Sequence, residues 1–126
     1  MIITDTSVWI DSFRGNFATF KELRLLYDSD QLLISGPVIA ELLQGAKTKK
    51  EAELIIELWK NIPRAPRDQS WFETGLNSFE NKWRSKGIGI IDAYLISLAW
   101  KNNYKIWTLD KKLIKAAGTN FIYSQN

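Results

Sequence analysis

The sequence predicts an α/β fold in which a mainly parallel central sheet is flanked by helices on both faces. Short apolar segments that suit buried strands alternate with longer segments of helical periodicity. This alternation favours parallel strands joined by helical crossovers, because a parallel sheet needs both faces covered. A chain of 126 residues can bury roughly two-thirds of its unfolded surface, and this one contains no repeat or linker. We therefore expect a single domain spanning 1–126.

The first elements are predicted from apolar runs and from the residues that end them. Residues 1–4 form a short apolar strand, which continues through Asp5-Thr6-Ser7 into Val8-Trp9-Ile10. Apolar residues recurring every three or four positions predict a helix over 16–28. A second strand over 32–35 ends at Gly36-Pro37. A helix is expected to begin there, because the missing N–H of proline costs nothing in a first helical turn.

The same criteria predict the rest of the chain. Helices are expected over 49–60 and 72–83, and Pro63 and Pro66 bound an irregular segment between them. The remaining predicted elements are a helix over 92–103, a strand over 105–108, a short helix over 111–117 and a last strand over 121–123.

The predicted helix over 72–83 has a clear apolar stripe. Its members stand at intervals of four, three and four residues: Phe72, Leu76, Phe79 and Trp83. This spacing is a strong signal for a helix. Four tryptophans stand at or beside core spacings, namely Trp59, Trp71, Trp83 and Trp100. Most of them are expected to pack inside the protein rather than to stack on bases.

The residues that are missing restrict the chemistry. The chain has no histidine and no cysteine, which removes Ser-His-Asp and Cys-His nucleophiles, a two-histidine ribonuclease mechanism and the usual zinc sites. An all-oxygen site for a hard cation such as Mg²⁺ or Mn²⁺ remains easy to build. No apolar run approaches about 20 residues, and the N-terminus lacks a signal-peptide pattern. We therefore expect a cytoplasmic protein that does not enter a membrane.

Positive charge gathers in clusters although the net charge is only +3. The clusters are Lys47, Lys49 and Lys50; Arg64 and Arg67; Lys82, Arg84 and Lys86; and Lys111, Lys112 and Lys115. Each cluster alone suits a solvated helix end or loop. Together they surround an acidic centre, an arrangement that suits a polyanion held by its phosphates.

That acidic centre consists of four carboxylates: Asp5, Glu41, Asp92 and Asp110. Taken singly, the three aspartates equally suit helix N-caps, and Glu41 suits a solvated helix flank. Taken together, they stand at strand ends or in first helical turns. In open α/β sheets the strand ends converge on the crevice where ligands bind. The four side chains are therefore expected to share one pocket.

Such a pocket has an electrostatic consequence. Unit charges ~4 Å apart repel by ~4 kcal/mol at an effective dielectric near 20, so the cluster needs a cation or a protonated member. Two metal ions about 4 Å apart can generate hydroxide and stabilise the leaving oxygen in phosphodiester cleavage. Four other acids stand in polar or turn-like surroundings and are expected on the surface: Asp11, Asp28, Asp30 and Asp68.

Four segments around these carboxylates form a recognisable series. They are Ile2-Ile3-Thr4-Asp5-Thr6-Ser7-Val8-Trp9-Ile10, Gly36-Pro37-Val38-Ile39-Ala40-Glu41-Leu42, Ile91-Asp92-Ala93-Tyr94-Leu95-Ile96 and Trp107-Thr108-Leu109-Asp110. In order and spacing they resemble the PIN-domain nucleases, particularly the VapC-type toxins of bacterial toxin–antitoxin pairs. The resemblance spans nearly the whole chain and is specific as a set, whereas any one segment alone is weak.

The resemblance implies a PIN-like fold and an Mg²⁺- or Mn²⁺-dependent endoribonuclease. The catalytic and metal-binding residues that it implies are Asp5, Glu41, Asp92 and Asp110, with hydroxyl contacts from Ser7 and Thr108. It also implies a homodimer and a VapB-like protein antitoxin that blocks the site. The basic residues that would position RNA by its backbone are Lys47, Lys49, Lys50, Lys82, Arg84, Lys86, Lys111 and Lys112.

One departure from the family pattern leaves the number of metal ions open, and three other functions also remain open. Lys112 stands where many relatives place another acidic residue, so a one-metal mechanism is possible beside a two-metal one. An aspartate-nucleophile phosphatase would want a second aspartate at the position of Ser7. A receiver-like sensing module would want paired acids after the first strand. A PIN domain that binds RNA or partners without cutting is the third alternative.

Overall fold

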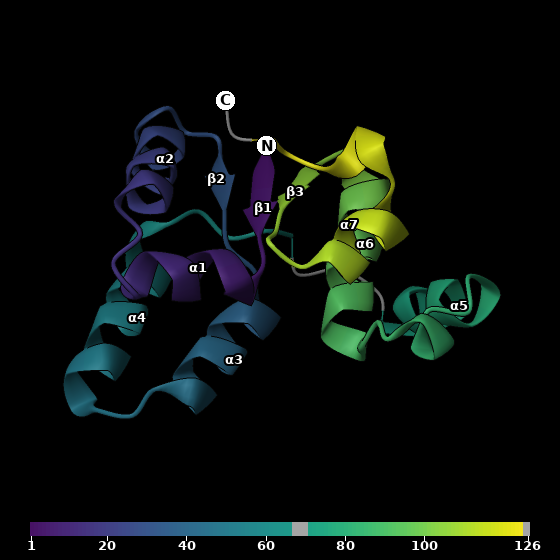
Figure 1. The fold of residues 1–126 in the computed structure, drawn as a ribbon, viewed down its shortest axis with the longest axis horizontal. Helices are drawn as coiled ribbons and strands as arrows, with labels where there is room; N and C mark the ends of the chain where they lie inside the picture. Colours follow the sequence, from purple (N-terminus) through teal and green to yellow (C-terminus); the bar gives the residue numbers. More distant parts are fainter. Residues whose placement is uncertain (67–70, 125–126) are drawn as a thin grey trace.

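The computed structural model describes residues 1–66 and 71–124, so the predicted surface charges Arg67 and Asp68 lie outside the described residues. Three parallel strands form the sheet in the order β2-β1-β3, with bounds β1 (Ile2–Thr4), β2 (Leu32–Leu33) and β3 (Lys105–Trp107). The central strand β1 pairs Ile3 with Leu33 on one side and with Ile106 on the other. The predicted α/β fold with a parallel sheet is confirmed (Figure 1).

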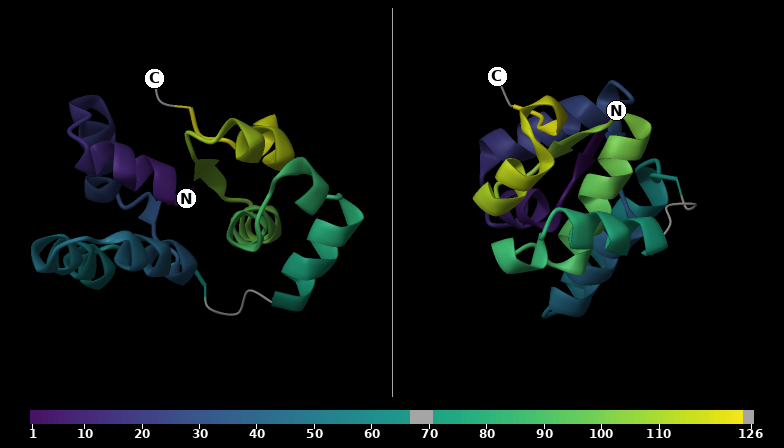
Figure 2. Two further views of the ribbon diagram at one scale, coloured as in Figure 1. Left: turned by 60° about the horizontal axis from the view of Figure 1, so that its bottom comes forward. Right: turned by 90° about the vertical axis from the view of Figure 1, so that its right-hand side faces the viewer.

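Helices cover both faces of this sheet. They are α1 (Thr6–Phe13), α2 (Phe17–Asp28), α3 (Gly36–Gly45), α4 (Lys49–Asn61), α5 (Trp71–Glu80), α6 (Ile90–Asn102) and α7 (Lys111–Ala117), with short 3₁₀ helices η1 (Arg84–Lys86) and η2 (Thr119–Phe121). Figure 2 shows α1 and α2 on one side of the strands and α6 on the other. Among the described residues, no helix is both long and apolar enough to cross a membrane.

Two segments differ from the prediction. The run Val8-Trp9-Ile10 belongs to helix α1, where the sequence predicts no helix; Asp5 caps α1 by accepting a hydrogen bond from the Ser7 backbone N–H. Val8 and Trp9 therefore reach the core from a helix. The prediction of a last strand over 121–123 is wrong. The 3₁₀ helix η2 occupies the start of that segment, and within the described chain the segment forms a single isolated β-bridge, between Ile122 and Ile106. Gly118, with φ 90, redirects the chain just before it.

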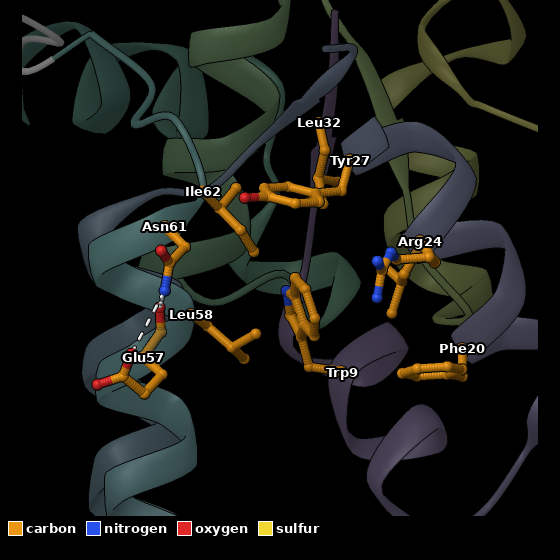
Figure 3. Close-up of a pocket in the computed structure, with 10 residues that line it drawn as sticks. Trp9, Phe20, Arg24, Tyr27, Leu32, Glu57, Leu58, Asn61 and Ile62 are labelled. Carbon is orange, nitrogen blue, oxygen red and sulfur yellow. Dashed lines mark hydrogen bonds between the residues drawn. The ribbon is translucent and has the colours of Figure 1, made fainter. Parts of the chain in front are cut away.

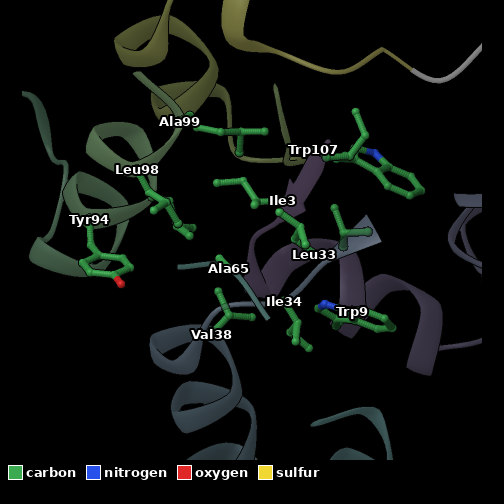
Figure 4. Close-up of a cluster of buried hydrophobic side chains, with 14 of the residues drawn as sticks. Ile3, Trp9, Leu33, Ile34, Val38, Ala65, Tyr94, Leu98, Ala99 and Trp107 are labelled. Atoms are coloured by element: carbon green, nitrogen blue, oxygen red, sulfur yellow. The ribbon is translucent and has the colours of Figure 1, made fainter. Parts of the chain in front are cut away.

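The core encloses the sheet and is dominated by α6. Figure 4 shows Ile3 and Trp107 of the sheet gathered with Leu98 and Ala99 of α6. All residues of α6 from Ala93 to Ala99 are buried, because α6 packs against β3, α5 and α7. A helix that is buried around its circumference holds its side chains firmly. α6 is therefore a rigid support for whatever its first turn carries.

Helix α5 packs on α6 through a face that the apolar stripe does not predict. The Asn77 side-chain amide donates to the Ser97 hydroxyl at 3.0 Å. Within the stripe, Trp83 packs as predicted and is 2% exposed, whereas Phe72 and Phe79 are 77% and 81% exposed. Leu76 is also exposed. The polar and small face of α5 meets α6, so its aromatic face is turned to solvent.

Trp83 holds the segment after α5 against α6. Its ring centroid lies 5.3 Å from that of Trp100, and the Trp100 indole N–H donates to the Ala117 carbonyl oxygen at 3.0 Å. The predicted packing is thus confirmed for Trp83 and Trp100. Trp71, in contrast, stacks on Tyr94 with centroids 4.7 Å apart but remains 53% exposed.

Trp83→Ala is expected to lower the free energy of unfolding by about 3–5 kcal/mol, since it removes a large buried ring and leaves a cavity beside Trp100. Urea unfolding followed by far-UV circular dichroism measures the change. Trp71→Ala is the matched control and should cost clearly less, because that ring is 53% exposed. Equal costs for the two variants would contradict the role assigned to Trp83.

Candidate acidic site

The sheet brings the four predicted acids toward one edge. Asp5 directly follows β1 and Asp110 lies three residues beyond β3; β1 and β3 are paired and parallel, so they end at the same edge. Glu41 is on α3. Asp92 lies in the first turn of α6, which begins two residues earlier than predicted with Gly89 as N-cap.

Asp5 is buried, at 5% exposed, and is held by hydroxyl groups. One carboxylate oxygen accepts from the Ser7 backbone N–H at 3.0 Å and from the Ser7 hydroxyl; the other accepts from the Thr108 hydroxyl. Burial raises the pKa of Asp5, and these hydrogen bonds act in the opposite direction. The net result is a raised pKa, so Asp5 gains from any nearby positive charge.

The same hydroxyls also position the loop that carries Asp110. Ser7 Oγ accepts from the Leu109 backbone N–H at 3.0 Å, and Thr108 Oγ1 accepts from the Asp110 backbone N–H at 3.0 Å. Asp110 in turn caps α7 by accepting from the Lys112 backbone N–H at 2.9 Å. Ser7 and Thr108 therefore connect the two aspartates through residues far apart in the sequence.

Glu41 is tied to α1 by a residue that the sequence prediction did not single out. The Thr6 hydroxyl donates to Glu41 Oε1 at 2.9 Å. The only sign in the sequence that Thr6 holds Glu41 is that Thr6 directly follows the capping residue Asp5. Thr6 and Glu41 line a groove of about 460 Å³ together with Arg14 and Lys47.

The charges of the other three acids all act on the pKa of Asp92. Burial is the largest cause that raises its pKa, to about 6, and the charges of Asp5, Asp110 and Glu41 each raise it further. Charges act in this way only over short distances or through poorly screened protein. The four carboxylates therefore form one electrostatic cluster.

The cluster offers oxygen donors to a cation, although its side chains are not closed around one. In the described ranges, 1–66 and 71–124, no three acidic side chains lie close enough together to hold a metal ion directly. The donor set consists of carboxylate and hydroxyl oxygens, which suit Mg²⁺ or Mn²⁺. Burial raises the pKa of Asp5 and, together with the charges of the other three acids, that of Asp92; a bound cation would favour the charged form of both.

The predicted basic residues are distributed unevenly around this cluster. Lys111 and Lys112 form the first turn of α7 next to Asp110, and Lys47 lines the Glu41 groove. Lys82, Arg84 and Lys86 lie in or beside η1, which precedes α6. Lys49 and Lys50 open α4, at the end of the α3–α4 hairpin farthest from the sheet (Figure 1).

A separate cavity of about 300 Å³ lies between α2 and α4, on the side of Trp9 (Figure 3). Its walls are mainly apolar, with Trp9 between Leu58 and Phe20 in this view, and Arg24 and Glu57 also line it. None of the four clustered acids lines it. This cavity is not part of the acidic site.

Thr108→Val is expected to lower the free energy of unfolding by about 1–3 kcal/mol, because Asp5 loses a buried donor and the Asp110 N–H loses its acceptor. Urea unfolding in EDTA measures this. The control is Thr119→Val, at an exposed threonine, which should change stability by less than about 0.5 kcal/mol. A Thr108→Val protein as stable as its parent would contradict the bridging role.

Comparison with known proteins identifies the family. The family model described as PIN domain matches residues 2–119. The chain is 33% identical over 118 residues to Ribonuclease VapC32 of Mycobacterium tuberculosis, which covers 93% of this chain and 90% of that protein.

Solved structures share the fold. VapBC2 from Rickettsia felis, bound to a DNA fragment from their promoter, superposes with a TM-score of 0.71 at 23% identity over 97% of this chain and 96% of that one. FitAcB from Neisseria gonorrhoeae gives 0.63 at 20% identity over 93% of each chain. The family model matches nearly the whole length of this chain, so the chain belongs to the PIN-domain family.

Proposed function

We propose that this protein is a metal-dependent endoribonuclease, the toxin of a bacterial toxin–antitoxin pair. The observation that carries the proposal is the convergence of three negative charges on Asp92, whose pKa burial and these charges raise to about 6. Carboxylates gathered in this way suit a hard cation, which can promote phosphodiester cleavage. The similarity to a protein named as a ribonuclease supports the choice of substrate.

Asp5 and Asp92 would hold the principal Mg²⁺ or Mn²⁺ ion, with Glu41 and Asp110 completing the site directly or through water. When bound, the ion supplies a hydroxide nucleophile at neutral pH and offsets charge on the phosphate. The protein keeps Asp5 in one orientation through Ser7 and Thr108. The buried helix α6 fixes the backbone that carries Asp92. Preorganisation of this kind lowers the cost of assembling the site during the reaction.

Lys112 favours a single ion in this proposal. It carries a positive charge in the first turn of α7, two residues after Asp110, where a second cation would be repelled. A cation on this side of the cluster would instead attract the RNA phosphate. A one-metal mechanism with Lys112 beside it is therefore the form that we propose.

The partners follow from the same proposal. The substrate is RNA, held through its backbone by the basic residues nearest the acids. We further propose a cytoplasmic homodimer whose activity is blocked by a VapB-like antitoxin. The similar structures VapBC2 and FitAB, each solved with a DNA fragment, support an assembly with a second protein.

The test uses antitoxin-free protein and end-labelled total tRNA and rRNA, with Mg²⁺, with Mn²⁺ and with EDTA. Discrete fragments that require the metal are expected. Intact RNA under all three conditions, from protein shown to be folded, would contradict the proposal and favour a domain that binds without cutting. Hydrolysis of a small phosphomonoester with RNA left intact would favour the phosphatase alternative.

A further inference from the structure

An open groove of about 1040 Å³ lies between the C-terminal half of α5 and the segment that leads to α6. Phe79, Lys82, Arg84 and Ile90 are among the residues that line it. Ile90 is the first residue of α6, and Asp92 is in the same helical turn. The groove therefore lies near the end of α6 that carries Asp92.

The apolar part of the groove includes an aromatic ring that does not pack inside the protein. Phe79 is 81% exposed, and Ile90, at 53%, is also exposed. The opposite face of α5 already packs on α6 through the Asn77–Ser97 hydrogen bond, so Phe79 contributes little to the fold. An exposed ring beside a groove is suited to stack on a planar group.

The polar part of the groove is cationic. Lys82 and Arg84 line it, and the only acidic residue among its described lining residues is Glu80. The ion pairs found in residues 1–66 and 71–124 include neither Lys82 nor Arg84, so both charges are available to a ligand. Lys82 moreover has a left-handed backbone, with φ 56, a conformation that glycine or asparagine adopts more easily.

The cationic surface continues from the groove toward the acids. A Cβ at Gly87 would lie 3.0 Å from Lys112 Nζ, so the Lys112 side chain extends over the backbone directly after η1. Lys86, at the end of η1, adds a further charge. Positive charge thus runs from Lys82 along η1 to the start of α7, which Asp110 caps.

We propose that this groove binds a single-stranded part of the RNA next to the bond that is cut. A base stacks on Phe79, and the adjoining phosphates are held by Lys82 and Arg84. Exposed aromatic rings combined with cations suit unpaired nucleotides, whose bases present free faces, whereas duplex bases are already stacked. This inference rests on the proposed ribonuclease function and names the form of RNA that the site takes.

The test measures binding of a short fluorescent single-stranded RNA of mixed sequence by anisotropy, in EDTA so that no cleavage occurs. Phe79→Ala should weaken binding roughly tenfold or more, while Phe79→Trp should retain it. The matched control is Phe17→Ala on α2, a ring 72% exposed, which should bind like the parent. Arg84→Gln should lower the slope of log affinity against log salt by about 0.7 per lost phosphate contact.

Three outcomes would overturn the inference. One is parental RNA affinity in Phe79→Ala; another is equal affinity for a blunt RNA duplex. The third is a Phe79→Ala protein that loses self-association in sedimentation equilibrium while its RNA affinity is unchanged, which would assign this face to a subunit interface. If a Phe79→Ala protein with parental RNA affinity still shows metal-dependent cleavage, the groove alone is overturned. Phe79-dependent binding by a protein that cuts no RNA would overturn the ribonuclease function alone.

Discussion

Asp5→Asn is expected to lower RNA cleavage by roughly a thousandfold or more, a loss of about 4 kcal/mol of transition-state stabilisation. Asp5 is the most buried of the clustered acids and lies at the end of the central strand. An amide of the same shape cannot supply the second negatively charged oxygen that a hard cation prefers. Cleavage of end-labelled RNA under single-turnover conditions measures the change.

The fold should survive this substitution. Asparagine caps helices as well as aspartate does, so the carbonyl oxygen of the introduced side chain can keep the hydrogen bond from the Ser7 backbone N–H. The Thr108 hydroxyl can turn and accept from the new amide. Asp30→Asn is a matched control, because Asp30 is exposed and left-handed at φ 58, where asparagine is well tolerated. An Asp5→Asn protein as active as the parent would refute the assignment of the site.

The position of Asp5 and Asp110 at one edge of the sheet could be predicted because both obey a local rule. Asp5 and Asp110 follow strands, and parallel strands that pair must end at one edge. The hydrogen bond from Thr6 to Glu41 could not be predicted, since it joins residues 35 positions apart on two helices. Spacing along a helix says nothing about which residue of another helix lies opposite.

The orientation of α5 and the helical state of α1 could not be predicted for a related reason. Periodicity correctly groups Phe72, Leu76 and Phe79 on one face of α5, but it does not say which face meets α6. That choice is made by tertiary contacts such as Asn77 with Ser97. In α1 the buried Val8 and Trp9 are adjacent, a pattern that suits a buried strand as well as a short helix.

Asp92→Asn is expected to abolish cleavage about as completely as Asp5→Asn but to stabilise the metal-free fold at neutral pH. The folded-state pKa of Asp92, about 6, lies above the ordinary value of 3.8. The folded protein therefore holds the Asp92 proton more tightly than the unfolded chain does. The associated stability is complete below pH 3.8 and is lost as the pH rises through about 6. The neutral amide of the variant carries no charge at any of these pH values and avoids this loss.

Thermal unfolding in EDTA tests the sign of this effect. The midpoint of Asp92→Asn should exceed that of the parent by a few degrees well above pH 6 and should approach it near pH 3.8. Mg²⁺ should raise the parent's midpoint but not the variant's, because the ion offsets the repulsion that Asp92 feels from Asp5, Asp110 and Glu41. A midpoint difference that is the same at both pH values would show that these charges do not converge on Asp92. With aspartate at position 92, the metal-free protein is less stable than with an amide there, but it holds a negative charge where a cation can bind.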